Sequence, residues 1–158
     1  MLRPHRHHRR TSDLRPVSLP PVTTSPEARA RAVFATFQTA VDTWVAEAVA
    51  DCFTDDVVYV GTAGYLHGRD ELLGYVREVF ERNEAMRWEL AQVHVFLDAP
   101  PLLGFAASGT IIGTSAGRPR ELPFRLSLLV EQQRATGATK IRHFHGSVPI
   151  DAFTSTSS

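Results

Sequence analysis

Histidine and arginine are the residues whose spacing in this chain could support chemistry. His143, His145 and Ser147 alternate along one predicted strand and therefore share a face, as do Arg125 and Ser127 on the preceding one. A histidine can move protons in both directions near neutral pH, and an arginine can hold a carboxylate or an enolate with two hydrogen bonds. We therefore predict His145 and Arg125 as the catalytic residues of a cofactor-free proton transfer, cyclisation or dehydration.

Each of these residues also has a non-catalytic interpretation. His145 could hydrogen-bond a neighbouring backbone group and anchor the end of the chain, and His143 is more typical of a structural or interfacial residue. Arg125 could be neutralised by an internal acid, either Glu89 or Glu131.

A second set of side chains is predicted to line a substrate pocket. It consists of Tyr59, His67, Trp88, Ser127, His143 and Trp44. The alternative for the aromatic members is a place in the core, since aromatic residues on strands are usually buried there. A metal site on the two histidines of the last strand would need a third, carboxylate ligand, and the sequence indicates none. We predict neither a metal nor a cofactor.

Composition limits the class of protein. The chain has 158 residues, enough for one domain, and 43% of them are hydrophobic, enough for a core. The single cysteine, Cys52, excludes a disulfide framework and a cysteine-based metal centre. No continuous apolar run approaches the roughly 18 residues of a membrane span. We expect a cytoplasmic protein that does not contact membranes.

Charge is distributed unevenly along the chain. Residues 1–25 contain five arginines and one acid, so 12 basic and 16 acidic residues remain in the rest. This composition, with prolines and without apolar periodicity, predicts a disordered basic arm over 1–25, a domain over 26–150 and a flexible tail over 151–158. A mildly acidic domain has no field that would attract polyphosphate, so we expect no nucleic-acid binding by the folded part.

The order of the predicted elements indicates the fold class. Ser25-Pro26-Glu27 predicts the start of a helix, with an N-cap, a proline at the first helical position and an acid in the first turn. Helical apolar spacing continues to Cys52, and we predict that a turn at 53–56 ends this helix. A short strand follows at Val57–Val60, and helical spacing returns after Gly68. Four strand-like runs with short turns follow, over 87–97, 102–114, 122–134 and 139–148. Helices followed by consecutive strands predict an α+β fold with an antiparallel sheet. Because this sheet is apolar in places on both faces, we expect a homodimer to cover the face away from the helices.

Several strings in this order resemble the nuclear transport factor 2-like superfamily, in its SnoaL-like branch. They are FTDD, VVYVGT, HGRDELLGYV and the terminal HFHGSVP, within a resemblance that runs from about Pro26 to Pro149. HFHGSVP is also similar to the last strand of the association domain of calcium/calmodulin-dependent kinase II, a member of the same superfamily. The resemblance implies a cone-shaped curved sheet wrapped round a long N-terminal helix, with an interior pocket for a small apolar or aromatic molecule. It also implies that Arg125 and His145 point into that cone.

The resemblance leaves the function open, because fold membership does not decide it. Members similar to ketosteroid isomerase use an aspartate and a tyrosine, and these positions correspond here to Gly61 and Phe37. We therefore predict a cyclase, isomerase or dehydratase that uses histidine and arginine instead. The alternative is a non-catalytic module for ligand binding or homo-oligomerisation. In a third interpretation, the basic arm binds nucleic acid or an acidic partner while the domain dimerises.

Overall fold

The computed structural model describes residues 24–62 and 64–149. The predicted arm, apart from its last two residues, and the predicted tail over 151–158 lie outside the described residues. The described helices are α1 (Pro26–Asp42), α2 (Ala46–Ala50) and α3 (Arg69–Arg82). The strands are β1 (Phe53–Gly61), β2 (Gly64–His67), β3 (Ala85–Ala99), β4 (Leu102–Ser115), β5 (Arg118–Gln132) and β6 (Thr139–Ser147).

The first predicted helix is divided in two. It begins as predicted, with Ser25 as N-cap accepting a hydrogen bond from the Ala28 backbone N–H at 3.1 Å. It ends at Asp42, because Trp44 adopts a left-handed backbone conformation with φ 56° and the Thr43 hydroxyl accepts a hydrogen bond from the Val45 N–H. Apolar spacing continues through this break into α2, so the prediction of one helix over 26–52 is wrong although its buried face was correctly identified.

The first strand is longer than predicted. Phe53–Asp56, interpreted from the sequence as the turn that ends the helix, belongs to β1 instead. Phe53 pairs with Ile141 of β6, and the Ile141 N–H donates to the Cys52 carbonyl at 2.8 Å. This pairing joins residues almost 90 positions apart, so local spacing could not reveal it. The short strand β2 was also missed, because its four residues carry no alternating pattern.

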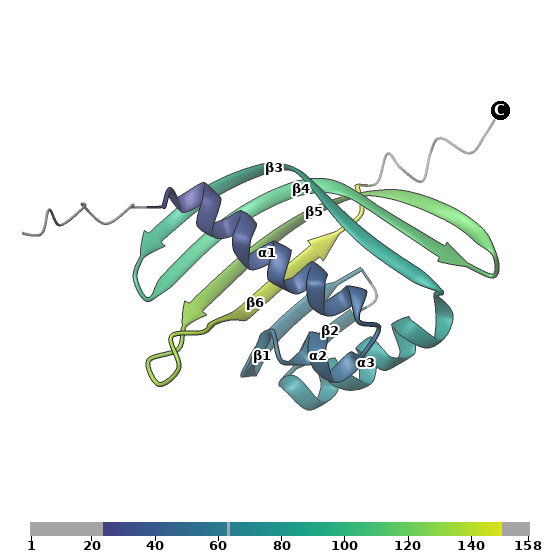
Figure 1. The fold of residues 1–158 in the computed structure, drawn as a ribbon, viewed down its shortest axis with the longest axis horizontal. Coiled ribbons are helices and arrows are strands. Elements are labelled where there is room, and N and C mark those ends of the chain that lie inside the picture. The colour runs from purple at the N-terminus through teal and green to yellow at the C-terminus, as the bar shows by residue number, and fades with distance from the viewer. Residues whose placement is uncertain (1–23, 63, 150–158) are drawn as a thin grey trace, which may run out of the picture.

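All six strands form one sheet in the order β2-β1-β6-β5-β4-β3. Neighbouring strands are antiparallel except β1 and β6, which run parallel, so the sheet is mixed rather than wholly antiparallel as predicted. The long strands β3, β4 and β5 curve over α1, and α3 lies across the β1–β2 end of the molecule (Figure 1).

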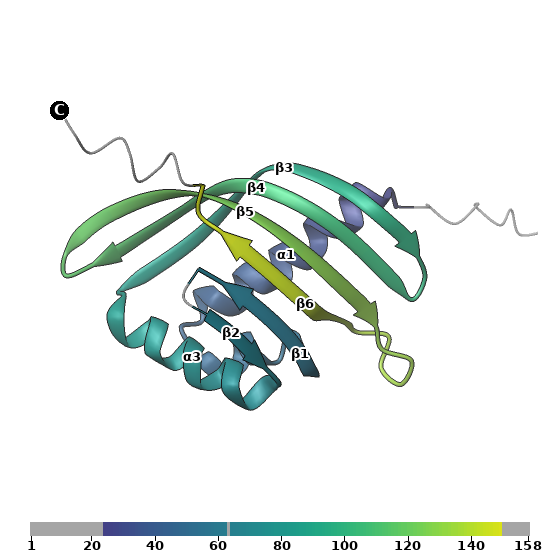
Figure 2. The same cartoon turned by 180° about the vertical axis from the view of Figure 1, so that it is seen from behind.

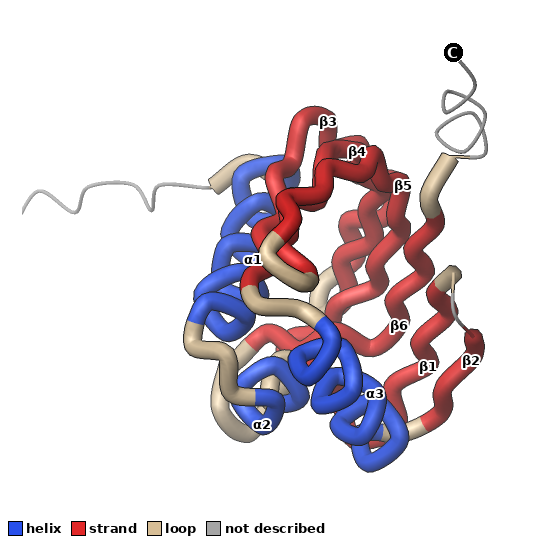
Figure 3. Tube along the Cα trace, turned by 90° about the vertical axis from the view of Figure 1, so that its right-hand side faces the viewer, coloured by secondary structure: helices blue, strands red, loops and turns tan. Residues whose placement is uncertain are grey.

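The core lies between the helices and the concave face of the sheet. Alternate residues of β5 show this clearly, since Phe124, Leu126, Leu128 and Val130 are at most 4% exposed and pack with Phe34, Phe37 and Val41 of α1. The three described helices lie on the same side of the sheet (Figure 3). Seen from behind, the strands lie in front of α1, and no described helix covers that side (Figure 2). We call this uncovered side the outer face.

Candidate functional site

A pocket of about 290 Å³ opens between α3 and the concave face of the sheet. Its floor is aromatic, with Phe37, Phe124, Phe144 and Trp88 meeting at ring-centroid distances of 5.0 to 6.4 Å. The other apolar lining residues come from all three helices and from the sheet: Val41, Val49, Phe53, Leu72, Val76, Val79, Phe80, Met86, Ile111 and Val148. Its size and apolar walls are typical of a site for one small molecule.

Few polar side chains line this pocket, and among the described lining residues there is no histidine, carboxylate, lysine or arginine. The polar side chains are those of Tyr59, Thr62, Tyr75, Asn83, Trp88 and Ser147. Among the described lining residues, the two tyrosines are the only ionisable ones. The pocket can therefore orient a molecule by hydrogen bonds, but it lacks the histidine or carboxylate that usually moves protons near neutral pH.

The two phenols lie side by side at one end of the pocket. The rings of Tyr59 and Tyr75 have centroids 5.5 Å apart, and Tyr59 also stacks on Phe144 at 4.8 Å. Burial raises the pKa of Tyr59 far above its ordinary value, and the neighbouring Tyr75 phenol raises it further. Tyr59 is consequently a neutral phenol throughout the physiological pH range, able to donate one hydrogen bond to a ligand.

The raised pKa of Tyr59 predicts a loss of stability in alkali. The phenol is neutral in the folded chain, whereas in the unfolded chain it ionises near pH 10. Its contribution to the free energy of unfolding is therefore complete below about pH 10, and the free energy of unfolding falls by about 1.4 kcal/mol per pH unit above it. Urea unfolding between about pH 8 and 11 should therefore show a smaller alkaline loss for Tyr59→Phe than for the unchanged protein. Tyr65→Phe, at a tyrosine that is 66% exposed, is the matched control and should lose stability like the unchanged protein. Equal alkaline losses in all three proteins would contradict the prediction.

The Trp88 indole N–H is a polar group of the pocket wall that is fully buried and has no partner among the described residues. Its Nε1 is buried and donates to no described residue. The ring lies among Phe34, Phe37, Phe124 and Phe144, at interplanar angles of 65 to 88°. An unpaired buried N–H lowers the stability of the fold by on the order of 1–3 kcal/mol. The aromatic rings around the indole offset only part of this cost.

Some predicted pocket residues lie in the pocket and others do not. Tyr59 and Trp88 line it. Trp44 stacks on Phe80 with ring centroids 4.1 Å apart and supports the pocket wall from behind, without being among the lining residues. Gly61 and Phe37, where the resemblance implied an aspartate and a tyrosine in other members, both line the pocket, so the alignment of these positions is consistent with the geometry.

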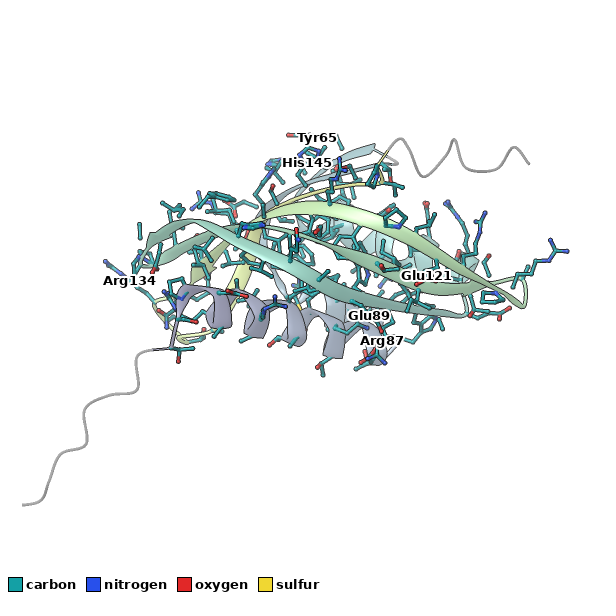
Figure 4. The ribbon with its side chains drawn as sticks, turned by 90° about the horizontal axis from the view of Figure 1, so that it is seen from above. Tyr65, Arg87, Glu89, Glu121, Arg134 and His145 are labelled. Carbon is teal, nitrogen blue, oxygen red and sulfur yellow. The ribbon has the colours of Figure 1, made fainter. Side chains whose placement is uncertain are left out.

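The predicted catalytic residues do not point into the cone. Arg125 and Ser127 alternate with the buried residues of β5, and they project from the outer face together with His145, which pairs with Ser127. His143 and His67, which both pair with Val58, lie on that face too. Figure 4 shows His145 on the side of the sheet away from α1. The prediction that these residues face a common interior is wrong, because period two shows which residues share a face but not which face meets the helices.

The structure also brings in residues that sequence reasoning did not select. Tyr75 lies between Leu72 and Val76 on α3, and Asn83 follows one helical turn after Val79. Their spacing places them on the buried stripe of this helix, so helical periodicity carries the signal for both residues. Thr62 and Ile111 could not be recognised as pocket residues from the sequence, because they line the pocket only through the curvature of the sheet, which turns the ends of β1 and β4 over it.

No group of three or more histidine, cysteine, aspartate or glutamate side chains is arranged to hold a metal ion within 24–62 and 64–149. No helix in the same ranges is long and apolar enough to cross a membrane.

Comparison with known proteins identifies the family. The SnoaL-like domain model matches residues 30–151, and the chain therefore belongs to this family, within the nuclear transport factor 2-like superfamily. No curated protein matches the sequence.

Solved structures show the same fold. A candidate calcium/calmodulin-dependent protein kinase II association domain from Xanthomonas campestris has a TM-score of 0.72 at 20% identity over 78% of this chain and 88% of its own. A candidate dehydratase of the nuclear transport factor 2-like family from Streptomyces avermitilis has a TM-score of 0.68 at 15% identity over 78% and 96%. A ketosteroid isomerase-like protein from Erwinia carotovora atroseptica has a TM-score of 0.61 at 23% identity over 80% and 98%. At these identities the likeness establishes the α+β fold alone.

Proposed function

We propose that this protein binds one small, largely apolar or aromatic molecule in the pocket beneath α3. The observation that carries this proposal is the lining: aromatic and aliphatic walls around about 290 Å³, with the phenols of Tyr59 and Tyr75 side by side at one end. A ligand that fits it has a flat hydrophobic body for the phenylalanine floor and a carbonyl or hydroxyl for Tyr59 and Tyr75.

An enzymatic role in this pocket would differ from the one predicted from the sequence. The names of two structural neighbours, a candidate dehydratase and a ketosteroid isomerase-like protein, support a cyclase, isomerase or dehydratase. Arg125 and His145 lie on the outer face and have no access to the pocket, so the chemistry would rest on hydrogen bonds from Tyr59 and Tyr75 to a developing oxyanion. We rank binding first, because no described lining residue is a base.

A pocket-filling variant tests the binding function. Val76→Trp places an indole among the lining residues of α3 and should weaken binding at least about tenfold, since it removes the space that the ligand needs. The measurement is a thermal-shift screen with flat carbonyl compounds, phenols and polycyclic aromatics, followed by calorimetry on the hits. Arg77→Trp, at the next position of α3 but exposed, is the matched control and should bind like the unchanged protein.

The outcomes of this screen separate the alternatives. Hits that bind the unchanged protein and Arg77→Trp but not Val76→Trp support the pocket. Hits that bind all three proteins equally, or a panel without any hit, would contradict it. Incubating each hit with the protein and analysing it by mass spectrometry and NMR then separates binding from turnover.

A second role, self-association as a homodimer, is supported by a different observation. The outer face of the sheet has no covering helix in the described residues (Figure 2). It carries the exposed aromatic side chains Phe96 and Tyr65. One structural neighbour is named as an association domain. A pair of chains that bury this face leaves the pocket on the opposite face open, so the two roles are compatible.

A further inference from the structure

Two polar residues of α3 line the pocket at well-separated positions. Tyr75 belongs to the middle of the helix, and Asn83 is its C-cap residue. Eight positions separate them in the sequence, which at 1.5 Å per residue places them about 12 Å apart along the helix axis. The lining residues of α3 between them are apolar: Val76, Val79 and Phe80. A bound molecule can therefore meet one polar group near each end of this wall, with only apolar side chains of α3 between them.

The amide of Asn83 is held so that its oxygen is free. Its Nδ2 donates a hydrogen bond to the Val79 carbonyl oxygen at 2.8 Å, one of the last four carbonyls of the helix. Within 24–62 and 64–149, its Oδ1 accepts a hydrogen bond from no residue. An amide donates only through nitrogen and accepts only through oxygen. The contact with Val79 therefore leaves the oxygen as the group that this lining residue can offer to a ligand.

Both neighbours of Asn83 are tied to the end of β4. The Arg82 carbonyl accepts a hydrogen bond from the Ser115 hydroxyl at 2.9 Å, and the Glu84 backbone N–H donates to the Thr114 carbonyl at 2.8 Å. These bonds hold the chain on each side of Asn83 before any ligand is present. Less conformational entropy is lost on binding when the contacting group is already in position.

The opposite end of the pocket has a different hydrogen-bonding character. The phenols of Tyr59 and Tyr75 lie side by side there and can each donate a hydrogen bond. The free oxygen of Asn83 can only accept one. The ligand that satisfies both ends has an acceptor, such as a carbonyl, at the tyrosine end and a hydroxyl at the Asn83 end.

We propose that Asn83 determines the specificity of the pocket, by accepting a hydrogen bond from the hydroxyl group of a flat ketone whose carbonyl accepts from Tyr59 and Tyr75. A span of about 12 Å suits a body of two rings with its oxygens at opposite ends. This inference rests on the proposed binding function, and it adds a second polar contact and the direction in which the ligand lies. A purely structural Asn83, which only caps α3, would affect ligands with and without the hydroxyl equally.

Three matched ketones test this inference by calorimetry with the full chain. They are chalcone, chalcone with a hydroxyl in the para position of the ring remote from the carbonyl, and the methyl ether of that hydroxyl compound. At about pH 6.5, where a phenol is neutral, the unchanged protein should bind the hydroxyl compound at least about fivefold more tightly than the other two. The methyl ether cannot donate, so it distinguishes a hydrogen bond from added size.

Substitution of Asn83 should remove this preference. In Asn83→Ala, the dissociation constants of chalcone and its hydroxyl compound should agree within about twofold. Glu81→Ala, at an exposed position of the same helical turn that does not line the pocket, is the matched control and should keep the preference. Circular dichroism shows whether Asn83→Ala folds. If it does not, Asn83→Gly replaces it, because helix ends tolerate glycine and this variant also lacks the amide.

A variant of the tyrosine end tests the direction of the ligand. The double variant Tyr59→Phe and Tyr75→Phe should weaken the binding of all three ketones by a similar factor, because it removes the donors to their common carbonyl. It should keep the preference for the hydroxyl compound. A preference that disappears in this double variant would place the hydroxyl at the tyrosines and overturn the proposed direction.

The remaining outcomes separate this inference from the pocket itself. Equal binding of the three ketones to the unchanged protein, binding of none of them, or a hydroxyl preference that persists in Asn83→Ala overturns the role of Asn83. The binding function still stands in these cases if other compounds bind the unchanged protein and lose affinity in Val76→Trp. Compounds that bind Val76→Trp as tightly as the unchanged protein overturn the pocket.

Discussion

Gly109→Ala is expected to abolish folding or to lower the free energy of unfolding by about 4 kcal/mol or more. Gly109 lies on β4 beside the irregular pairing of β3, where the register shifts between Leu90 and Gln92. A Cβ at this position would overlap the backbone carbonyl oxygen of Glu89, and it would lie 2.9 Å from Cζ of Phe124. The side chain of Phe124 could turn away, but the carbonyl belongs to the strand backbone and has little freedom to move.

A second glycine provides the control for this prediction. Gly74 lies on the exposed side of α3, where an added Cβ meets no atom within 4 Å. Gly74→Ala should raise the free energy of unfolding by about 0.5–1 kcal/mol, because alanine favours the helix and glycine does not. Urea unfolding followed by circular dichroism measures both changes. Equal stabilities of the Gly109→Ala and Gly74→Ala proteins would show that the close approach of β3 and β4 is not as described.

Phe144→Ala is expected to cost about 3–5 kcal/mol, the usual loss when a fully packed phenylalanine is truncated. Phe144 is 2% exposed, and it stacks on Tyr59 at 4.8 Å and lies within 6.4 Å of the rings of Phe37, Phe53 and Trp88. It therefore joins the hydrophobic core to the floor of the pocket. Removing its ring leaves a cavity that the surrounding aromatic rings can fill only in part.

This substitution also tests the pocket, because the cavity opens into it. A ligand identified in the screen should bind Phe144→Ala less tightly, whereas a bulkier analogue should lose less affinity or gain some. Leu122→Ala is the control for stability, since this side chain is 38% exposed and its truncation should cost less than about 1 kcal/mol. A loss below about 1 kcal/mol for Phe144→Ala would mean that the aromatic floor is not packed as described.

The architecture was largely predictable from local patterns. The N-cap at Ser25, the apolar stripe of α1 and the helix after Gly68 follow from residue type and spacing, and the structure confirms each of them. The four long strands were identified within four residues at each end. Local patterns sufficed here because capping, helical periodicity and strand alternation act between residues that are close in the sequence.

The topology was less predictable. The parallel pairing of β1 with β6 joins distant segments, and no local signal distinguishes it from an antiparallel pairing. The break between α1 and α2 depends on the backbone conformation of Trp44, a residue type that rarely adopts a positive φ. In both cases a contact that forms only in the folded chain overrides the local preference.

At the candidate site, strand alternation fixed which residues share a face, and the packing of the helices fixed which face is buried. Alternation along β5 and β6 determined that Arg125 and Ser127 share a face, as do His143 and His145, and the structure preserves both groupings. The side of the sheet that α1 covers then decided that Phe124 and Phe144 line the pocket while Arg125 and His145 form the outer face. Alternation is a property of the backbone of one strand, whereas the choice of face depends on which side buries more apolar area against the helices, and that comparison involves the whole chain.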